Sequence, residues 1–258
     1  MNEFKSWRAY WDFQRRVKKD QRYIRSVEDE EFLKVVLETS QKRHFKLKQD
    51  ELLWRAQIGH DWEYDNQIEE EIPCPFPPSR MVPLKDRAKE GRANPKGIPY
   101  LYLATQKETA MSEVRPWIGA YISCASFKIK RDLRMVNLSE YHTENLFELS
   151  YFNKEKELTA EEKEKAVWTH IDRAFSEPVT NQEDGSEYIP TQIIAELIKS
   201  DGMDGIAYKS NFGGNTGYNV MLFSLDEANL HSCQLYKVNS AEFNFIEDSN
   251  PYSLRNTD

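Results

Sequence analysis

Apolar residues recur at helical spacing in two stretches near the start of the chain. In residues 4–20, Phe4, Trp7 and Trp11 fall on one side of a helix. Residues 27–40 have a second apolar side, and their first turn is crowded with acidic residues, which the helix dipole favours there. We therefore predict two helices, and a boundary near residue 48, where the pattern changes.

After this boundary, short apolar or alternating runs predict strands, and longer amphipathic runs predict helices. Residues 61–98 are rich in proline and charge, and we expect them to be loops with a functional role, because long irregular segments usually have one. Thr105 and Glu108 have the spacing of a capping box at a helix start. The strands are expected at 51–59, 98–105, 119–129, 133–138, 203–209 and 218–223, and the helices at 106–118, 159–175 and 188–200.

Composition and charge narrow the class of protein. Of the 258 residues, 39% are hydrophobic and 30% charged, which suits a folded chain with a sizeable core. The net charge is −8, but residues 1–48 hold 13 Lys/Arg against 8 Asp/Glu, a net +5, so the rest carries −13. An acidic body argues against a nucleic-acid-binding protein. The basic start of the chain is either a solvated helix face or a contact for RNA or an acidic partner.

The lack of targeting signals in the sequence and the spacing of the cysteines favour a cytoplasmic protein. No apolar run approaches the length of about 18 residues that a membrane span needs. The first residues lack the apolar region of a secretory signal. Cys74, Cys124 and Cys233 are widely spaced and lack metal-ligand spacing, so we expect reduced thiols.

The candidate chemistry is concentrated in residues 90–116, EGRANPKGIPYLYLATQKETAMSEVRP. Arg92 lies in a Gly/Asn/Pro-rich loop, Tyr102 in the strand that follows, and Glu113 in the next helix. Upstream, Arg55 lies in a predicted strand. Arginine binds phosphate oxygens through a planar fork, and a carboxylate in a pocket can stabilise positive charge.

Each of these residues also has a purely structural explanation. Arg55 and Arg92 could form surface ion pairs, Tyr102 could be a core tyrosine, and Glu113 could be an exposed helix glutamate. Known short motifs do not decide the question. Residues 212–217 lack the GK[ST] ending of a phosphate-binding loop, and the sequence has no HExxH, CxxC or GxSxG.

Five sequence blocks, in order over residues 51–225, resemble the RES domain, a family in which many members are the toxin half of bacterial toxin–antitoxin pairs that destroy NAD. The blocks are LWRAQIG (53–59), PPSRM (77–81), GRANPKGIPYLYLA (91–104), ETAMSEVRPWIG (108–119) and DGIAYKSN (204–211). The resemblance implies an α+β fold with an ADP-ribosyltransferase-like core, in which two small sheets surround a cleft for NAD.

The resemblance also suggests a division of the chain. Residues 1–48 would be a helical N-terminal extension, 49–235 the catalytic domain with a helical insertion at 140–187, and 236–258 a C-terminal tail. The aromatic stripe of the extension, Trp7, Tyr10, Trp11 and Gln14, must be buried somewhere. We expect an interface with a partner or a second copy, with the extension as a separable unit.

Carried over residue by residue, the family's polar set falls on Arg55, Tyr102, Glu113 and Ser210, and its GR-x-N loop on Arg92. The implied catalytic residues are Glu113, Tyr102 and Arg55, and the implied substrate-binding residues are Arg55, Arg92, Tyr102 and Ser210, with no metal. The carboxylate would stabilise the oxocarbenium-like centre that forms when the nicotinamide–ribose bond breaks.

The expected function is therefore cleavage of NAD by hydrolysis or phosphorolysis, with NAD as substrate and no separate cofactor, as in a toxin that depletes cellular NAD. Two alternatives stay open: a protein ADP-ribosyltransferase, and a non-catalytic module that binds a partner. The expected partners are NAD, a cognate antitoxin protein and further copies of the chain, with no membrane and no nucleic acid.

Overall fold

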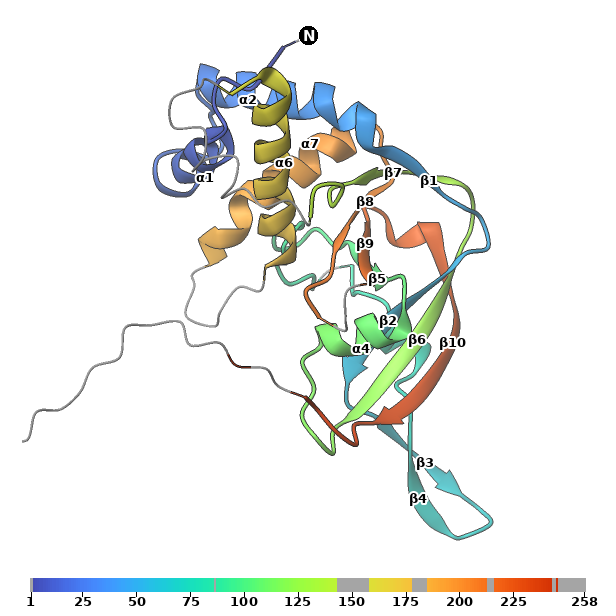
Figure 1. Ribbon diagram of the computed structural model, residues 1–258. Helices are drawn as coiled ribbons and strands as arrows, with labels where there is room; N and C mark the ends of the chain where they lie inside the picture. The colour runs from blue at the N-terminus through green and yellow to red at the C-terminus, as the bar shows by residue number, and fades with distance from the viewer. Residues whose placement is uncertain are drawn as a thin grey trace, which may run out of the picture.

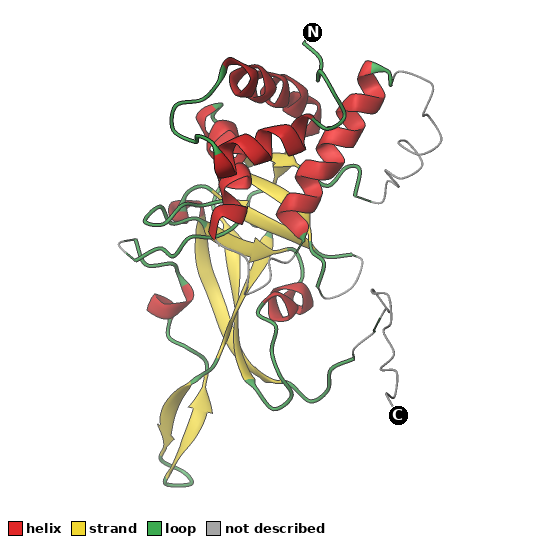
Figure 2. Ribbon diagram, turned by 90° about the vertical axis from the view of Figure 1, so that its left-hand side faces the viewer, coloured by secondary structure: helices red, strands yellow, loops and turns green. Residues whose placement is uncertain are grey.

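Helices gather at one end of the protein, and a strongly twisted sheet extends away from them (Figures 1 and 2). The computed structural model describes residues 2–85, 87–142, 158–177, 185–212, 216–242 and 245. The helices at this end are α1 (Ala9–Lys19), α2 (Val27–Ser40), α6 (Ala160–Ser176) and α7 (Ile189–Ser200). The chain also has short 3₁₀ helices, which are η1 (Gln41–Arg43), η2 (Gly185–Tyr188) and η3 (Leu225–Glu227). In the described residues, no helix is long and apolar enough to cross a membrane.

Local sequence explains where these helices begin and end. Ser26 precedes α2, and its hydroxyl accepts a hydrogen bond from the backbone N–H of Asp29 at 3.2 Å. Thr159 and Glu162 form a reciprocal capping box at the start of α6. Gly202 follows α7 at φ 81°, a conformation that glycine adopts without strain.

The main sheet has eight strands among the described residues, in the order β1-β7-β8-β9-β5-β2-β6-β10. Within it, β2 and β5 are paired through one position, where Trp54 lies opposite Ala104, so the sheet consists of two halves joined at a narrow seam. The α+β class is confirmed, but in place of two separate small sheets the described residues form one sheet whose two halves meet at this seam. The strands are β1 (His44–Leu47), β2 (Leu52–Ile58), β5 (Leu101–Ala104), β6 (Tyr121–Ile129), β7 (Leu133–Asn137), β8 (Gly205–Lys209), β9 (Tyr218–Leu222) and β10 (Ala228–Lys237).

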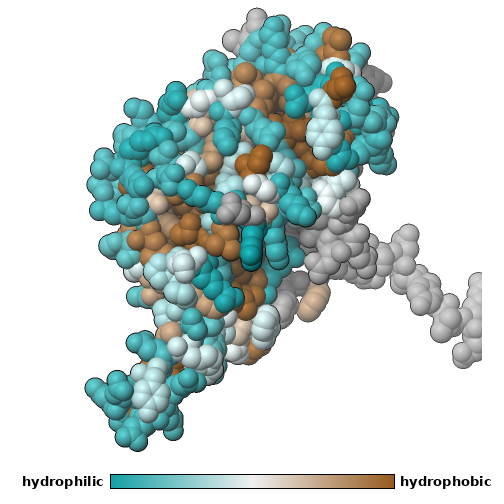
Figure 3. All heavy atoms as spheres, turned by 180° about the vertical axis from the view of Figure 1, so that it is seen from behind, coloured by the Kyte–Doolittle hydropathy of each residue, from teal (hydrophilic) through white to brown (hydrophobic). Residues whose placement is uncertain are grey.

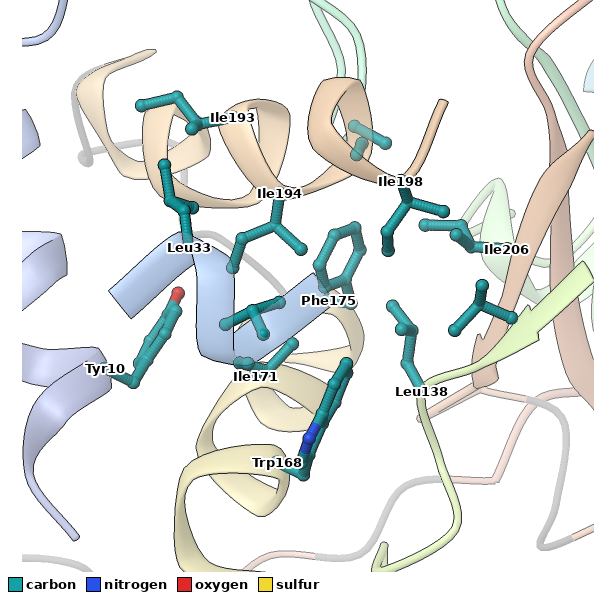
Figure 4. Packing of buried hydrophobic residues seen from close by; sticks show 14 of the residues in the cluster. Tyr10, Leu33, Leu138, Trp168, Ile171, Phe175, Ile193, Ile194, Ile198 and Ile206 are labelled. Atoms are coloured by element: carbon teal, nitrogen blue, oxygen red, sulfur yellow. The ribbon is translucent and has the colours of Figure 1, made fainter. Parts of the chain in front are cut away.

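The largest core cluster lies between the helices and the β7-β8-β9 part of the sheet. Figure 4 shows Tyr10 of α1, Leu33 of α2, Trp168 of α6 and Ile194 of α7 pointing into the same interior. The indole N–H of Trp168 donates to the hydroxyl of Thr39 at 3.0 Å, which satisfies a fully buried polar group. A second cluster occupies the other part of the sheet.

The packing of α1 bears on the interface that was expected for the aromatic stripe. Tyr10, Phe13 and Val17 are at most 2% exposed and belong to the main core cluster, so α1 is docked on the protein's own body. Trp11 is 43% exposed, and its ring lies 4.4 Å from that of His170 on α6. The first helices therefore cover the core, and they do not behave as a separate unit in this structure.

Several predicted elements differ from the structure. Residues 61–98, expected to be loops, contain the hairpin β3 (Asp61–Asp65) and β4 (Glu70–Cys74) and a short helix, α3 (Pro78–Met81). The helix expected at 106–118 is the shorter α4 (Lys107–Glu113). Its N-cap is Gln106, not Thr105, because the Thr105 hydroxyl accepts a hydrogen bond from the N–H of Tyr218 instead.

The predicted start of the domain falls just after β1, and its predicted end falls inside β10. β1 pairs with β7 before residue 48, and β10 pairs with β6 across residue 235. The predicted insertion contains α6, which packs with α1 and α7. Parts of this insertion, of the predicted turn at 212–217 and of the tail lie outside the described residues.

Candidate active site

The seam between the two half-sheets opens into a pocket. β2 and β5 are paired at Trp54 and Ala104, and α4 packs over this region against β2 and β6. The pocket has a volume of about 280 Å³, close to the lower end of ligand sites. Its lining comes from β2, β5, α4, β8 and β9: Trp54, Arg55, Ala56, Tyr102, Leu103, Ala104, Ala110, Glu113, Val114, Tyr208 and Asn219.

Glu113, the last residue of α4, is held by two neutral donors. Its Oε1 accepts a hydrogen bond from the Ser210 hydroxyl and another from the Asn219 amide, each at 2.6 Å. Ser210 follows β8 and Asn219 lies in β9, and the antiparallel pairing of these strands brings the two side chains to one carboxylate. Within the described residues, Oε2 of Glu113 accepts no hydrogen bond from the protein, so it can accept one from a ligand in the pocket.

Ser210 is fixed by its own backbone surroundings. The N–H of Phe212 donates to the Ser210 hydroxyl oxygen at 3.0 Å, just after β8 ends. The side chain is 4% exposed, so it reaches Glu113 rather than open solvent. The structure therefore gives Ser210 a role in holding the carboxylate, and its expected contact with substrate stays a prediction.

Arg55 lies in β2 on the pocket side of the seam. One guanidinium nitrogen, Nη1, donates to the backbone carbonyl of Tyr102 at 3.1 Å, which ties the two half-sheets together. Among the described residues its Nε is buried without a partner. Burial lowers the pKa of the guanidinium, although arginine still stays charged at neutral pH. A desolvated cation with an unused donor is suited to bind an anionic group.

Tyr102 supports the Gly/Asn/Pro-rich loop with its hydroxyl. The hydroxyl donates to Oδ1 of Asn94 at 2.7 Å and accepts from the N–H of Ala93 at 3.1 Å. A side chain at Gly91 would lie 2.9 Å from this hydroxyl, which explains why the loop has glycine there. Burial raises the pKa of Tyr102, so the phenol is neutral, and its ring is left to line the pocket.

Arg92 is the predicted site residue that the structure keeps apart from the others. Its guanidinium donates to the backbone carbonyl of Ala174 at 3.0 Å and to that of Glu177, at the C-terminal end of α6. A cation at this end of a helix is favoured by the helix dipole. Arg92 is not part of the pocket lining, and its substrate-binding role stays a prediction.

The sequence interpretation missed Asn219, Trp54 and Tyr208. Trp54 and Tyr208 lie in the quoted blocks, next to or near predicted site residues, but nothing in the sequence indicates that they line the same pocket. Asn219 could have been found from the pairing of the last two predicted strands, since it lies opposite Tyr208. In the described residues, no group of three His, Cys, Asp or Glu side chains could hold a metal ion.

Comparison with known proteins identifies the family. The RES domain matches residues 52–245, which is most of the chain, and the protein belongs to this family. A chain of the M. tuberculosis MbcT–MbcA toxin–antitoxin complex is similar over 79% of this protein and 92% of its own length, with 16% identity and a TM-score of 0.39. No curated protein matches the chain.

Proposed function

We propose that the protein is an NAD-consuming enzyme that cleaves the bond between nicotinamide and ribose. The observation that carries this proposal is the carboxylate of Glu113. One oxygen of this carboxylate accepts hydrogen bonds from Ser210 and Asn219, and the other accepts none within the described chain. Glu113 lines a pocket that is also lined by the buried Arg55. Membership of the RES domain family supports the same reaction.

The chemistry requires a group that stabilises positive charge rather than a strong acid. When the bond breaks, the electron pair leaves with nicotinamide, whose ring nitrogen loses its positive charge, and C1 of the ribose becomes oxocarbenium-like. Glu113 would hold a ribose hydroxyl and stabilise this centre electrostatically. Because the leaving group departs neutral, no general acid is needed, and no histidine lines the described part of the pocket.

The remaining lining residues would bind and orient the substrate. Arg55 can contact a pyrophosphate oxygen through its unused donor. Tyr102, Tyr208 and Trp54 supply aromatic surface for the nicotinamide ring. Burial raises the pKa of Tyr208, so both tyrosines stay neutral and add no charge that would repel the pyrophosphate.

The ADP-ribosyl group would pass to water or phosphate. In the cell, the protein would then act as a toxin that depletes NAD, and a cognate antitoxin would restrain it. The pocket is small and lies at a seam, which favours a small acceptor over a protein side chain.

The test is product analysis by chromatography of NAD incubated with the purified protein, with and without phosphate. We expect one nicotinamide per NAD consumed, with ADP-ribose in plain buffer and a phosphorylated ADP-ribose if phosphate is the acceptor. Label on an added protein, in place of either product, would favour the ADP-ribosyltransferase alternative. Absence of nicotinamide under all conditions would overturn the proposal.

A further inference from the structure

Two surface patches of opposite charge lie at opposite ends of the protein. One is the acidic hairpin, residues 61–74, which projects from the far end of the sheet, and the other is the basic loop, residues 15–27, around the connection between α1 and α2 (Figure 1). Neither patch contributes to the pocket at Glu113. Because the patches are at opposite ends, they cannot contact each other within one chain.

The acidic hairpin combines negative charge with exposed apolar side chains. It carries no lysine or arginine, and its turn residue Ile68 is 55% exposed. Trp62 and Tyr64 are each 56% exposed and, being two residues apart in β3, lie on the same face. Figure 3 shows the hairpin standing out from the body, with mostly hydrophilic residues and some of intermediate hydropathy. Its carboxylates are Asp61, Glu63, Asp65, Glu69, Glu70 and Glu71.

The body of the protein supports the hairpin near its base, where the Trp62 ring contacts His60 and β4 contacts β10. β3 and β4 pair with each other and with no other strand of the described chain. A two-stranded hairpin alone is marginally stable in water, and both of its outer edges offer unpaired backbone groups. Large exposed aromatic side chains on such an element indicate a surface that binds another molecule.

The basic loop has the complementary character. Tyr23 is 93% exposed, Ile24 82% and Val27 71%. Asp20 is the sole acidic residue between positions 15 and 25, against six basic ones: Arg15, Arg16, Lys18, Lys19, Arg22 and Arg25. Four of these six are paired with carboxylates: Arg15 with Asp12, Arg16 with Asp29, Lys18 with Glu187 and Arg25 with Glu30. Lys19 and Arg22 have no ion-pair partner among the described residues and supply the unpaired positive charge of the loop.

We propose that the acidic hairpin of one copy binds the basic loop of a second copy. Each patch presents three exposed apolar residues beside an excess of charge, negative in the hairpin and positive in the loop, which gives both contact area and orientation. Two copies lying side by side in opposite directions make the contact twice and close as a dimer, the commonest symmetric assembly. This interaction is independent of the proposed NAD chemistry.

The first measurement is sedimentation velocity of the full chain at increasing concentration. We expect reversible self-association that weakens at least about tenfold between low salt and about 0.5 M salt, because the contact is between exposed opposite charges. A chain that stays monomeric at every concentration in low salt would overturn the proposal, even if the hairpin captured an unrelated basic protein.

Two variants test whether self-association depends on this contact and not on another surface. The hairpin variant carries Trp62→Ala, Tyr64→Ala and Glu70→Lys, and the loop variant carries Arg22→Glu, Tyr23→Ala and Ile24→Ala. Each alone should associate at least about tenfold more weakly. Mixed in equal amounts they should form a 1:1 complex through one of the two contacts, because the intact loop of the first meets the intact hairpin of the second.

Matched controls are Leu84→Ala and Lys96→Glu, which change an exposed apolar and an exposed basic residue outside both patches. Both controls should associate like the unmodified chain. Circular dichroism establishes that every variant is folded, and nicotinamide release provides a separate readout of the pocket. Variants that associate normally, or a mixture that stays monomeric, would contradict the pairing of these two patches.

Discussion

Glu113 is held in its pocket by neutral donors rather than by a cation. The Ser210 hydroxyl and the Asn219 amide fix one carboxylate oxygen, and no lysine or arginine of the described chain forms an ion pair with it. An ion pair would offset part of the negative charge that an oxocarbenium-like centre needs. Neutral donors orient the carboxylate and leave its charge available.

Asn219→Ala should therefore lower kcat more than it changes KM for NAD. The amide donates to a charged oxygen, an interaction that contributes about 1.5–3 kcal/mol, so we expect a loss of about tenfold or more. Steady-state nicotinamide release is the measurement. Asn229→Ala on the exposed face of β10 is the matched control. Turnover within about twofold of the unmodified chain would show that Asn219 does not position Glu113.

Arg55→Ala should mainly weaken NAD binding. Loss of a charge-assisted hydrogen bond to pyrophosphate corresponds to an increase in Kd of about 10- to 100-fold. Calorimetric titration of NAD checks this, with Lys128→Ala on the neighbouring strand β6 as control. Unchanged affinity would mean that Arg55 only joins the half-sheets through its contact with the Tyr102 carbonyl.

At the scale of elements, the sequence predicted helices and strands most accurately where several local signals agree. The helix at 27–40 was predicted with its observed bounds, because an apolar side and an acidic first turn agree, and the structure adds a serine N-cap at Ser26. β10 was missed because its residues are mostly exposed and polar, and pairing with β6 rather than apolar alternation holds it in place. The acidic hairpin was predicted to be loops for a similar reason, since its residues are also mostly exposed.

Arg92 shows what local sequence cannot reveal. Its place in a glycine-containing loop could be read from the sequence, but its carbonyl partners Ala174 and Glu177 lie more than 80 residues away. The same limit applies to the pocket. The family resemblance predicted Arg55, Tyr102 and Glu113 as site residues, whereas the seam that brings them to one pocket depends on strand pairing between distant segments.

Arg92→Ala should lower the free energy of unfolding by about 1–2 kcal/mol, because it removes two hydrogen bonds and a cation from the end of α6. Urea unfolding is the measurement, and NAD affinity should fall less than in Arg55→Ala. Unchanged stability combined with a large loss of affinity would place Arg92 in the substrate site instead.

At the scale of the whole molecule, the first helices complete the core. Phe13 of α1 and Val36 of α2 are fully buried in the cluster that contains Trp168 of α6 and Ile194 of α7. The change of charge near residue 48 suggested a separable unit, but charge describes only the solvent-facing side of these helices. Their buried sides determine how they pack, and β1 continues them into the sheet.

Removal of residues 1–48 should therefore expose the main core cluster and cause aggregation. The truncated chain also loses β1 and so leaves the edge of β7 unpaired. Size-exclusion chromatography and light scattering are the measurements. A truncated protein that is soluble, monomeric and active would contradict this view and restore the separable unit.

The most direct test of the proposed function compares nicotinamide release by the unmodified chain, Glu113→Gln and the control Glu108→Gln, an exposed glutamate on the same helix. The account predicts that Glu113→Gln stays folded and loses at least about 100-fold in turnover, as for the loss of one charge-stabilising group, while Glu108→Gln keeps full activity. Turnover by Glu113→Gln within a few fold of the unmodified chain would contradict the account.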